Sequence, residues 1–87
     1  MSTYHTAVLG AGVIGASWTA LFLASGRSVS VFDPDPQAEV NVRAYIKRAW
    51  PTMTELGLTE RGDPGRGNFA ATAAEAVDGA GFVLENV

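Results

Sequence analysis

The stretch AVLGAGVIGASW, residues 7–18, decides the fold, because two apolar runs of different spacing meet in it at three glycines. The run before Gly10 is short and continuous, which is typical of a buried strand over residues 6–9. The run that starts at Val13 repeats at steps of three and four residues, which predicts an amphipathic helix. Its repeating positions are Ile14, Trp18, Leu21, Phe22 and Ser25. Alanines at every fourth position keep this helix slim enough to pack closely on a sheet.

Each of the three glycines has its own physical role at such a strand-to-helix turn. Gly10 makes the tight turn out of the strand, Gly12 leaves the backbone open to a pyrophosphate, and Gly15 lets the helix pack closely on the strand. The start of the helix then directs unpaired N–H groups and a partial positive charge at the phosphates. The residues of this turn that are predicted to bind a dinucleotide are Gly10, Ala11, Gly12, Val13, Ile14 and Gly15.

A carboxylate, Asp33, stands at the end of a second predicted strand, residues 28–33. It follows Gly15 by 18 positions (33 minus 15), close to the roughly 20 typical of a dinucleotide-binding unit. A carboxylate there accepts hydrogen bonds from both hydroxyls of the adenosine ribose and repels a 2′-phosphate. Asp35 adds negative charge and no arginine directly follows Asp33. The predicted cofactor is therefore NAD rather than NADP, and the lack of a Gly-Lys-Ser/Thr sequence excludes a Walker-type loop.

The middle of the chain predicts a long second helix over residues 36–56. Asp35 suits the N-cap, proline suits the first helical position, and Glu39 places negative charge near the helix start. Pro51 removes one backbone donor, so we expect it to kink or interrupt the helix, and Gly57 is the expected end. The predicted apolar side consists of Val40, Ala44, Ile46, Ala49, Trp50, Met53 and Leu56.

Three shorter elements follow this helix after a predicted loop. Residues 58–68 are rich in glycine, proline and charge, which indicates a loop. Residues 69–72 predict a short third strand, and the spacing of Thr72 and Glu75 is that of a capping box opening a short helix. Residues 81–87 form a fourth apolar run, which predicts a fourth strand.

The alternation of strands and helices favours an α/β fold with a parallel sheet and helices on both faces. Right-handed crossovers make this a Rossmann-type arrangement, incomplete at about four strands, whose strand order reverses beside the first strand. At 87 residues the chain is one small domain, expected over residues 1–87 as the N-terminal part of a dinucleotide-binding domain. The uncovered edge strand predicts marginal stability or self-association.

The composition excludes several other classes of function. The net charge is −3 and the six basic residues are scattered, which leaves no basic stripe for nucleic acid. The chain has no cysteine, so it forms neither disulfides nor a thiolate zinc site. The single histidine, His5, has no second ligand beside it, so no metal site is predicted. Neither a signal peptide nor an apolar run long enough for a membrane appears, which favours a cytoplasmic protein.

Three segments resemble the 3-hydroxyacyl-CoA dehydrogenase family. VLGAGVIGASWTALFLASGRSVSVFDPDP (residues 8–36) is similar to the family's N-terminus, and VRAYIKRAWPTMTELGL (residues 42–58) resembles its carnitine dehydrogenase branch. AEAVDGAGFVLENV (residues 74–87) resembles the stretch that ends the fourth strand. The resemblance implies that Glu85 lies near the nicotinamide end of NAD. Gly81 departs from the family's usual aspartate, which weakens a turn contact.

The resemblance also implies an NAD-dependent oxidoreductase that oxidises a 3-hydroxy substrate. L-carnitine would give 3-dehydrocarnitine, and a 3-hydroxyacyl-CoA would give its 3-oxo form. In this family the catalytic histidine, its carboxylate partner and a helical domain that forms the homodimer all follow the fourth strand. No catalytic residue is therefore expected in this chain. Its small-molecule substrate would bind through the part that follows the fourth strand in this family.

Two alternatives stay open at this point. The chain fits a stand-alone dinucleotide-binding or interaction module without catalysis, because it lacks the family's base. The glycine turn could also simply join strand to helix and bind nothing, with Asp33 as an acid beside a helix.

Overall fold

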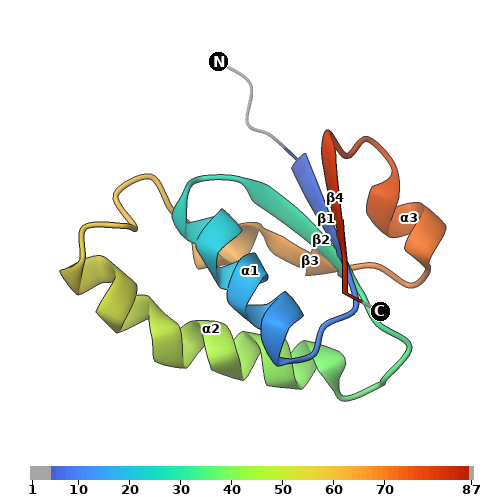
Figure 1. Ribbon diagram of the computed structural model, residues 1–87, viewed down its shortest axis with the longest axis horizontal. Helices are drawn as coiled ribbons and strands as arrows, with labels where there is room; N and C mark the ends of the chain where they lie inside the picture. The colour runs from blue at the N-terminus through green and yellow to red at the C-terminus, as the bar shows by residue number, and fades with distance from the viewer. Residues whose placement is uncertain (1–4, 87) are drawn as a thin grey trace.

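A parallel sheet of four strands carries helices on both faces in this computed structural model, which describes residues 5–86 (Figure 1). In chain order its elements are β1 (His5–Leu9), α1 (Val13–Ala24), β2 (Ser28–Phe32), α2 (Ala38–Glu55), the 3₁₀ turn η1 (Pro64–Arg66), β3 (Gly67–Phe69), α3 (Ala73–Val77) and β4 (Phe82–Glu85). The strand order β3-β2-β1-β4 reverses beside β1, which confirms the predicted Rossmann-type arrangement.

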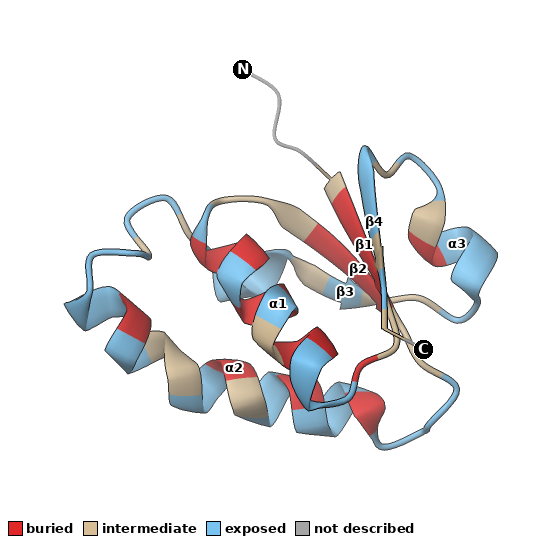
Figure 2. Ribbon diagram, viewed as in Figure 1, coloured by how far each residue is buried: buried red, intermediate tan, exposed pale blue. Residues whose placement is uncertain are grey.

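The two faces of the sheet are covered unequally. Helices α1 and α2 lie together on one face, whereas the short helix α3 contacts β1 and β2 from the other (Figure 1). Most of α3 is exposed, while α1 and the two central strands carry much of the buried surface (Figure 2). The hydrophobic core therefore lies between the sheet and the α1–α2 layer.

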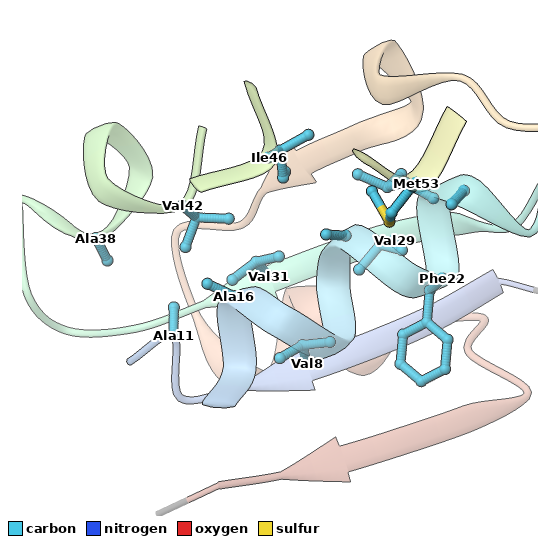
Figure 3. Packing of buried hydrophobic residues seen from close by; sticks show 13 residues of the cluster. Val8, Ala11, Ala16, Phe22, Val29, Val31, Ala38, Val42, Ile46 and Met53 are labelled. Atoms are coloured by element: carbon cyan, nitrogen blue, oxygen red, sulfur yellow. The ribbon is translucent and has the colours of Figure 1, made fainter. Parts of the chain in front are cut away.

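Valines of the central strands and small residues of α1 build this core (Figure 3). The predicted apolar face of α1 is only partly correct: Phe22 is buried, whereas Ile14 is 65% exposed and Trp18 and Leu21 are also exposed. Small side chains occupy most of the interface and let the helix axis come close to the sheet, and Phe22 and Leu23 are the large residues that are buried with them. The buried residues of α1 are Gly15, Ala16, Thr19, Ala20, Phe22, Leu23 and Ala24.

Helix α2 differs from its prediction at its start and on its apolar side. It begins at Ala38, because the carboxylate of Asp35 accepts the N–H of Gln37 in a turn ahead of the helix. Pro51 does not interrupt it, since the helix continues to Glu55. The buried residues are Ala38, Val42, Ile46 and Met53, whereas the predicted core residues Val40 and Leu56 are exposed. Gly57 ends the helix with φ +74°, as predicted.

The third strand is displaced from its predicted position. β3 starts at Gly67 and ends at Phe69, so the predicted loop over residues 58–68 holds η1 and most of this strand. The predicted N-cap of α3 is confirmed, because the hydroxyl of Thr72 accepts the N–H of Glu75 at 3.1 Å. The carboxylate of Glu75 accepts the N–H of Ala71 at 3.3 Å instead of that of Thr72, so the second half of the predicted capping box is shifted by one residue. The fourth strand spans Phe82–Glu85, and the predicted strand residue Val87 lies outside the described residues.

Candidate functional site

The turn between β1 and α1 lies at the carboxyl end of the sheet. Gly10 has φ +94°, a conformation that side-chain-bearing residues rarely adopt, and its N–H donates to the Phe32 carbonyl at 2.9 Å. A Cβ at Gly15 would overlap the carbonyl oxygen of Gly10. Gly15 is therefore required by the contact between α1 and the turn, rather than by a contact with the strand itself. The fold alone accounts for glycine at both positions.

Gly12 differs from the other two glycines, because the fold does not require it. A Cβ at Gly12 would meet no atom within 4 Å, so the space above it is open. The helix that follows has no side-chain cap and no acidic residue in its first turn. The first N–H groups of a helix have no partner within it, so Gly12, Val13 and Ile14 lie where an anion can accept from them.

Asp33 lies directly beside this turn, as the sequence predicted it would. Its Oδ2 accepts the N–H of Ala11 at 2.7 Å, and its Oδ1 accepts the N–H of Asp35 at 2.8 Å. Each carboxylate oxygen offers two lone pairs, so both keep acceptor capacity for a hydroxyl group. The N–H of Ala11 is directed to Asp33, which makes Ala11 part of the support of the turn.

Glu85 ends β4 at the same edge of the sheet. It is paired in register with Leu9, the last residue of β1, and it is exposed. Both strands therefore end together, so Glu85 lies next to the glycine turn. The strand reversal brings it there, because β4 is the neighbour of β1.

Asn86 is a residue of this site that sequence reasoning missed. Its backbone N–H donates to the Leu9 carbonyl at 2.8 Å, and its side-chain Nδ2 donates to the Gly10 carbonyl at 3.3 Å. The strand reversal was a usable signal, because any residue that follows the fourth strand must lie beside the turn that follows the first.

His5 lies at the amino end of β1, whereas the glycine turn follows the carboxyl end. Its ring nitrogens bond the hydroxyls of Ser28 at 2.8 Å and Ser30 at 2.9 Å. Among residues 5–86, no group of three or more His, Cys, Asp or Glu side chains is placed to hold a metal ion. In the same part of the chain, none of the helices combines the length and the hydropathy needed to cross a bilayer.

The site fits a dinucleotide on three observations from this structure. The space over Gly12 is open, the start of α1 is uncapped, and a carboxylate with spare acceptor capacity lies beside the turn. A diphosphate needs the first two, and a ribose with both hydroxyls free needs the third. A dinucleotide that carries a 2′-phosphate fits less well, since Asp33 would repel it.

Comparison with known proteins agrees with this geometry. The sequence model of the family described as "3-hydroxyacyl-CoA dehydrogenase, NAD binding domain" matches residues 5–87. The chain is 46% identical over 82 residues to an L-carnitine dehydrogenase of Streptomyces coelicolor, 94% of this chain and 26% of that protein. It is 41% identical over 80 residues to the enzyme of that name from Burkholderia mallei, 92% of this chain and 25% of that protein.

Two solved structures share the fold. The crystal structure of a 5-dehydrogenase of a pyridine carboxylic acid, described as an NAD+ dependent dismutase, has a TM-score of 0.81 and 28% identity. It matches 99% of this chain and 28% of that one. A diketoreductase has a TM-score of 0.79 at 22% identity, covering 100% of this chain and 33% of that one. The chain thus spans about a quarter to a third of the proteins it matches.

Proposed function

Because the chain belongs to the family of 3-hydroxyacyl-CoA dehydrogenase NAD-binding domains, we propose that it is the NAD-binding part of an enzyme that oxidises L-carnitine to 3-dehydrocarnitine. The relatives named L-carnitine dehydrogenase support this substrate, since they are 41–46% identical to nearly the whole chain. The observation that carries the cofactor assignment is the open backbone at Gly12, with Asp33 beside the same turn.

Each residue of the site has a proposed role in holding the cofactor. The N–H groups of Gly12, Val13 and Ile14 would bind the diphosphate, because they lie at the positive end of the α1 dipole. Asp33 would accept hydrogen bonds from the adenosine ribose, and Glu85 would lie near the nicotinamide end. When bound, NAD supplies the acceptor for the hydride that leaves the alcohol carbon of the substrate.

Oxidation of an alcohol also needs a group that accepts the hydroxyl proton. His5 does not suit this role, since it lies at the opposite end of β1 from the cofactor site and is held by two serine hydroxyls. We therefore place the proton acceptor, the substrate pocket and the subunit contacts of a homodimer in a longer polypeptide. The cytoplasmic location also stays a prediction of the sequence.

A 3-hydroxyacyl-CoA is the second candidate substrate, favoured by the description of the family that matches. A chimera tests whether residues 5–86 support NAD-dependent oxidation when they replace the corresponding segment of the Streptomyces coelicolor L-carnitine dehydrogenase, and we expect it to form NADH with L-carnitine. The longer polypeptide that carries this chain separates the two candidates, because it supplies its own substrate pocket. We expect that polypeptide to form NADH with L-carnitine and none with a 3-hydroxyacyl-CoA. The same chimera with Asp33→Ala is the control, which should need a higher NAD concentration for the same rate.

A direct titration tests the cofactor role on the chain alone. Calorimetry should show NAD binding to the 87-residue protein, and an assay with L-carnitine should show no turnover, because the proton acceptor is missing. A chain that binds NAD, together with a chimera inactive on both substrates, would favour the non-catalytic module instead. A chain that binds no NAD would contradict the proposed cofactor role.

A further inference from the structure

Asn86 packs into the room that two glycines of the turn leave free. A Cβ at Gly10 would lie 3.1 Å from the backbone oxygen of Asn86, and a Cβ at Gly15 would lie 3.2 Å from its Nδ2. The side-chain Nδ2 donates to the Gly10 carbonyl at 3.3 Å. Asn86 is half-buried, and its backbone is fixed by the 2.8 Å bond from its N–H to the Leu9 carbonyl.

The peptide unit between Gly10 and Ala11 is consequently held at both ends. Its C=O accepts from Nδ2 of Asn86, and its N–H donates to Oδ2 of Asp33 at 2.7 Å. In a trans peptide these two groups point in opposite directions. The two side chains therefore hold the peptide from opposite sides, one from the end of β4 and the other from the end of β2.

This peptide needs such support because glycine offers little resistance to rotation. A flip of the unit would exchange the places of its oxygen and its N–H. The partially negative oxygen would then face the Asp33 carboxylate, and the next residue, Gly12, would change its direction. The open backbone at Gly12 thus depends on the orientation of the peptide that precedes it.

We propose that Asn86 is a positioning residue of the cofactor site, which holds the Gly10–Ala11 peptide so that the backbone at Gly12 can receive a diphosphate. The inference rests on the proposed NAD-binding function of this site. It assigns Asn86 no contact with the cofactor and a role through the turn alone.

The test uses Asn86→Asp, which keeps the size of the side chain but sets a carboxylate oxygen against the Gly10 carbonyl. Asn86→Ser shortens the side chain and removes the Nδ2 group that donates to Gly10, without adding charge. Asn68→Asp is the matched control, because Asn68 lies on β3, is exposed and uses its Oδ1 to accept from Ser30, as an aspartate also would. Circular dichroism and thermal melts identify the temperature at which every variant is folded.

Binding is then measured by calorimetry with NAD and ADP-ribose, and by NMR shift changes with adenosine, which has no diphosphate. We expect Asn86→Asp to weaken NAD and ADP-ribose by about tenfold or more and Asn86→Ser by about threefold to tenfold. Adenosine should lose less affinity than NAD and ADP-ribose in both Asn86 variants, because it has no diphosphate to bind at Gly12, and Asn68→Asp should match the wild type. A merely structural role would weaken adenosine and NAD by the same factor, which would overturn the inference, as would unchanged NAD affinity in folded Asn86→Asp.

The rate of amide hydrogen exchange at Gly10 to Ile14 is measured in the protein without NAD. This measurement tests the inference independently of the proposed function, because it does not depend on cofactor binding. Faster exchange in Asn86→Asp than in Asn68→Asp supports the hold on the turn. If the wild type binds no NAD, the proposed function fails on that result alone. Unchanged exchange in Asn86→Asp would overturn the inference whether or not NAD binds.

Discussion

The backbone N–H of Ala11 donates a 2.7 Å hydrogen bond to the Oδ2 of Asp33. This bond joins the end of β1 to the end of β2, so the predicted ribose-binding acid also holds the predicted phosphate-binding turn. A substitution at Asp33 therefore acts on the cofactor directly and on the turn indirectly. An asparagine is the mildest substitution, because it keeps an oxygen for Ala11 and removes the charge together with the acceptor for the N–H of Asp35.

We expect Asp33→Asn to weaken NAD binding by about tenfold, since one charged acceptor for the ribose hydroxyls is replaced by a neutral one. The preference for NAD over NADP should fall as well, because an amide does not repel a 2′-phosphate. Addition of Pro34→Arg should shift the preference toward NADP. Calorimetric titration with both dinucleotides checks this, and an unchanged NAD affinity in Asp33→Asn would contradict the assignment.

Alanine at two glycines should separate cofactor binding from stability. Gly12→Ala should leave the thermal unfolding midpoint almost unchanged, because its methyl group enters open space, yet NAD binding should fall because that space is the proposed diphosphate site. Gly15→Ala should destabilise the fold by several kcal/mol, since its methyl group would overlap the Gly10 carbonyl oxygen. Thermal melts measure the stability of both variants, and NAD titrations measure their cofactor affinity. Retained NAD binding in Gly12→Ala would exclude the open backbone as the diphosphate site.

The strand order and the place of the glycine turn could be predicted from sequence because they depend on local signals. A continuous apolar run, three glycines and an acid at a fixed distance are visible without a partner element. The prediction for α1 is wrong at Ile14 and Leu21, because hydrophobicity alone places large apolar residues on the buried side of a helix. The close approach of the helix to the sheet reverses this preference, and only the packed structure shows how close the helix lies.

Asn86 illustrates the other limit of the sequence. The strand reversal indicates that the residue after β4 lies near the turn, but asparagine at that position does not predict a bond to Gly10, which is 76 positions away along the chain. The hydrogen bonds of His5 could not be predicted from the sequence either, because neither partner is near it in the chain. Its partners lie 23 and 25 positions away on β2, where the parallel register of β1 and β2 places them.

His5 is predicted to stabilise the sheet and to have no part in cofactor binding. It bonds Ser28 and Ser30 on β2, and the hydroxyl of Ser30 donates to Asn68 on β3 at 3.2 Å, so hydrogen bonds through Ser30 connect His5 to the third strand. We expect His5→Ala to lower the free energy of unfolding by about 1–3 kcal/mol, because it removes two hydrogen bonds and leaves buried Ser30 short of a partner.

Ser28→Ala is the matched variant for this prediction, because it removes one of the two bonds and should cost about half as much. Denaturant unfolding measures both variants, and NAD affinity should stay at the wild-type value below the unfolding range. A His5→Ala protein of normal stability but weakened NAD binding would contradict the structural role.

The last prediction concerns β4, which pairs with β1 on one side and forms the edge of the sheet within residues 5–86. Phe82 is 50% exposed and Val83 is 44% exposed on this strand, and the Phe82 ring packs edge-on against Phe22 beside exposed Trp18. An apolar strand with unpaired backbone groups invites pairing with a second copy of the chain. We therefore expect the isolated protein to self-associate as its concentration rises. Val83→Lys should suppress this association, because a charged side chain at an edge opposes strand pairing.

Val40→Lys is the control for this prediction. Val40 is 62% exposed on α2, so the same change in charge lies away from the edge and should leave association intact. Sedimentation velocity over a range of concentrations gives the result, and a wild-type protein that stays monomeric throughout and unfolds cooperatively would refute the role of this edge.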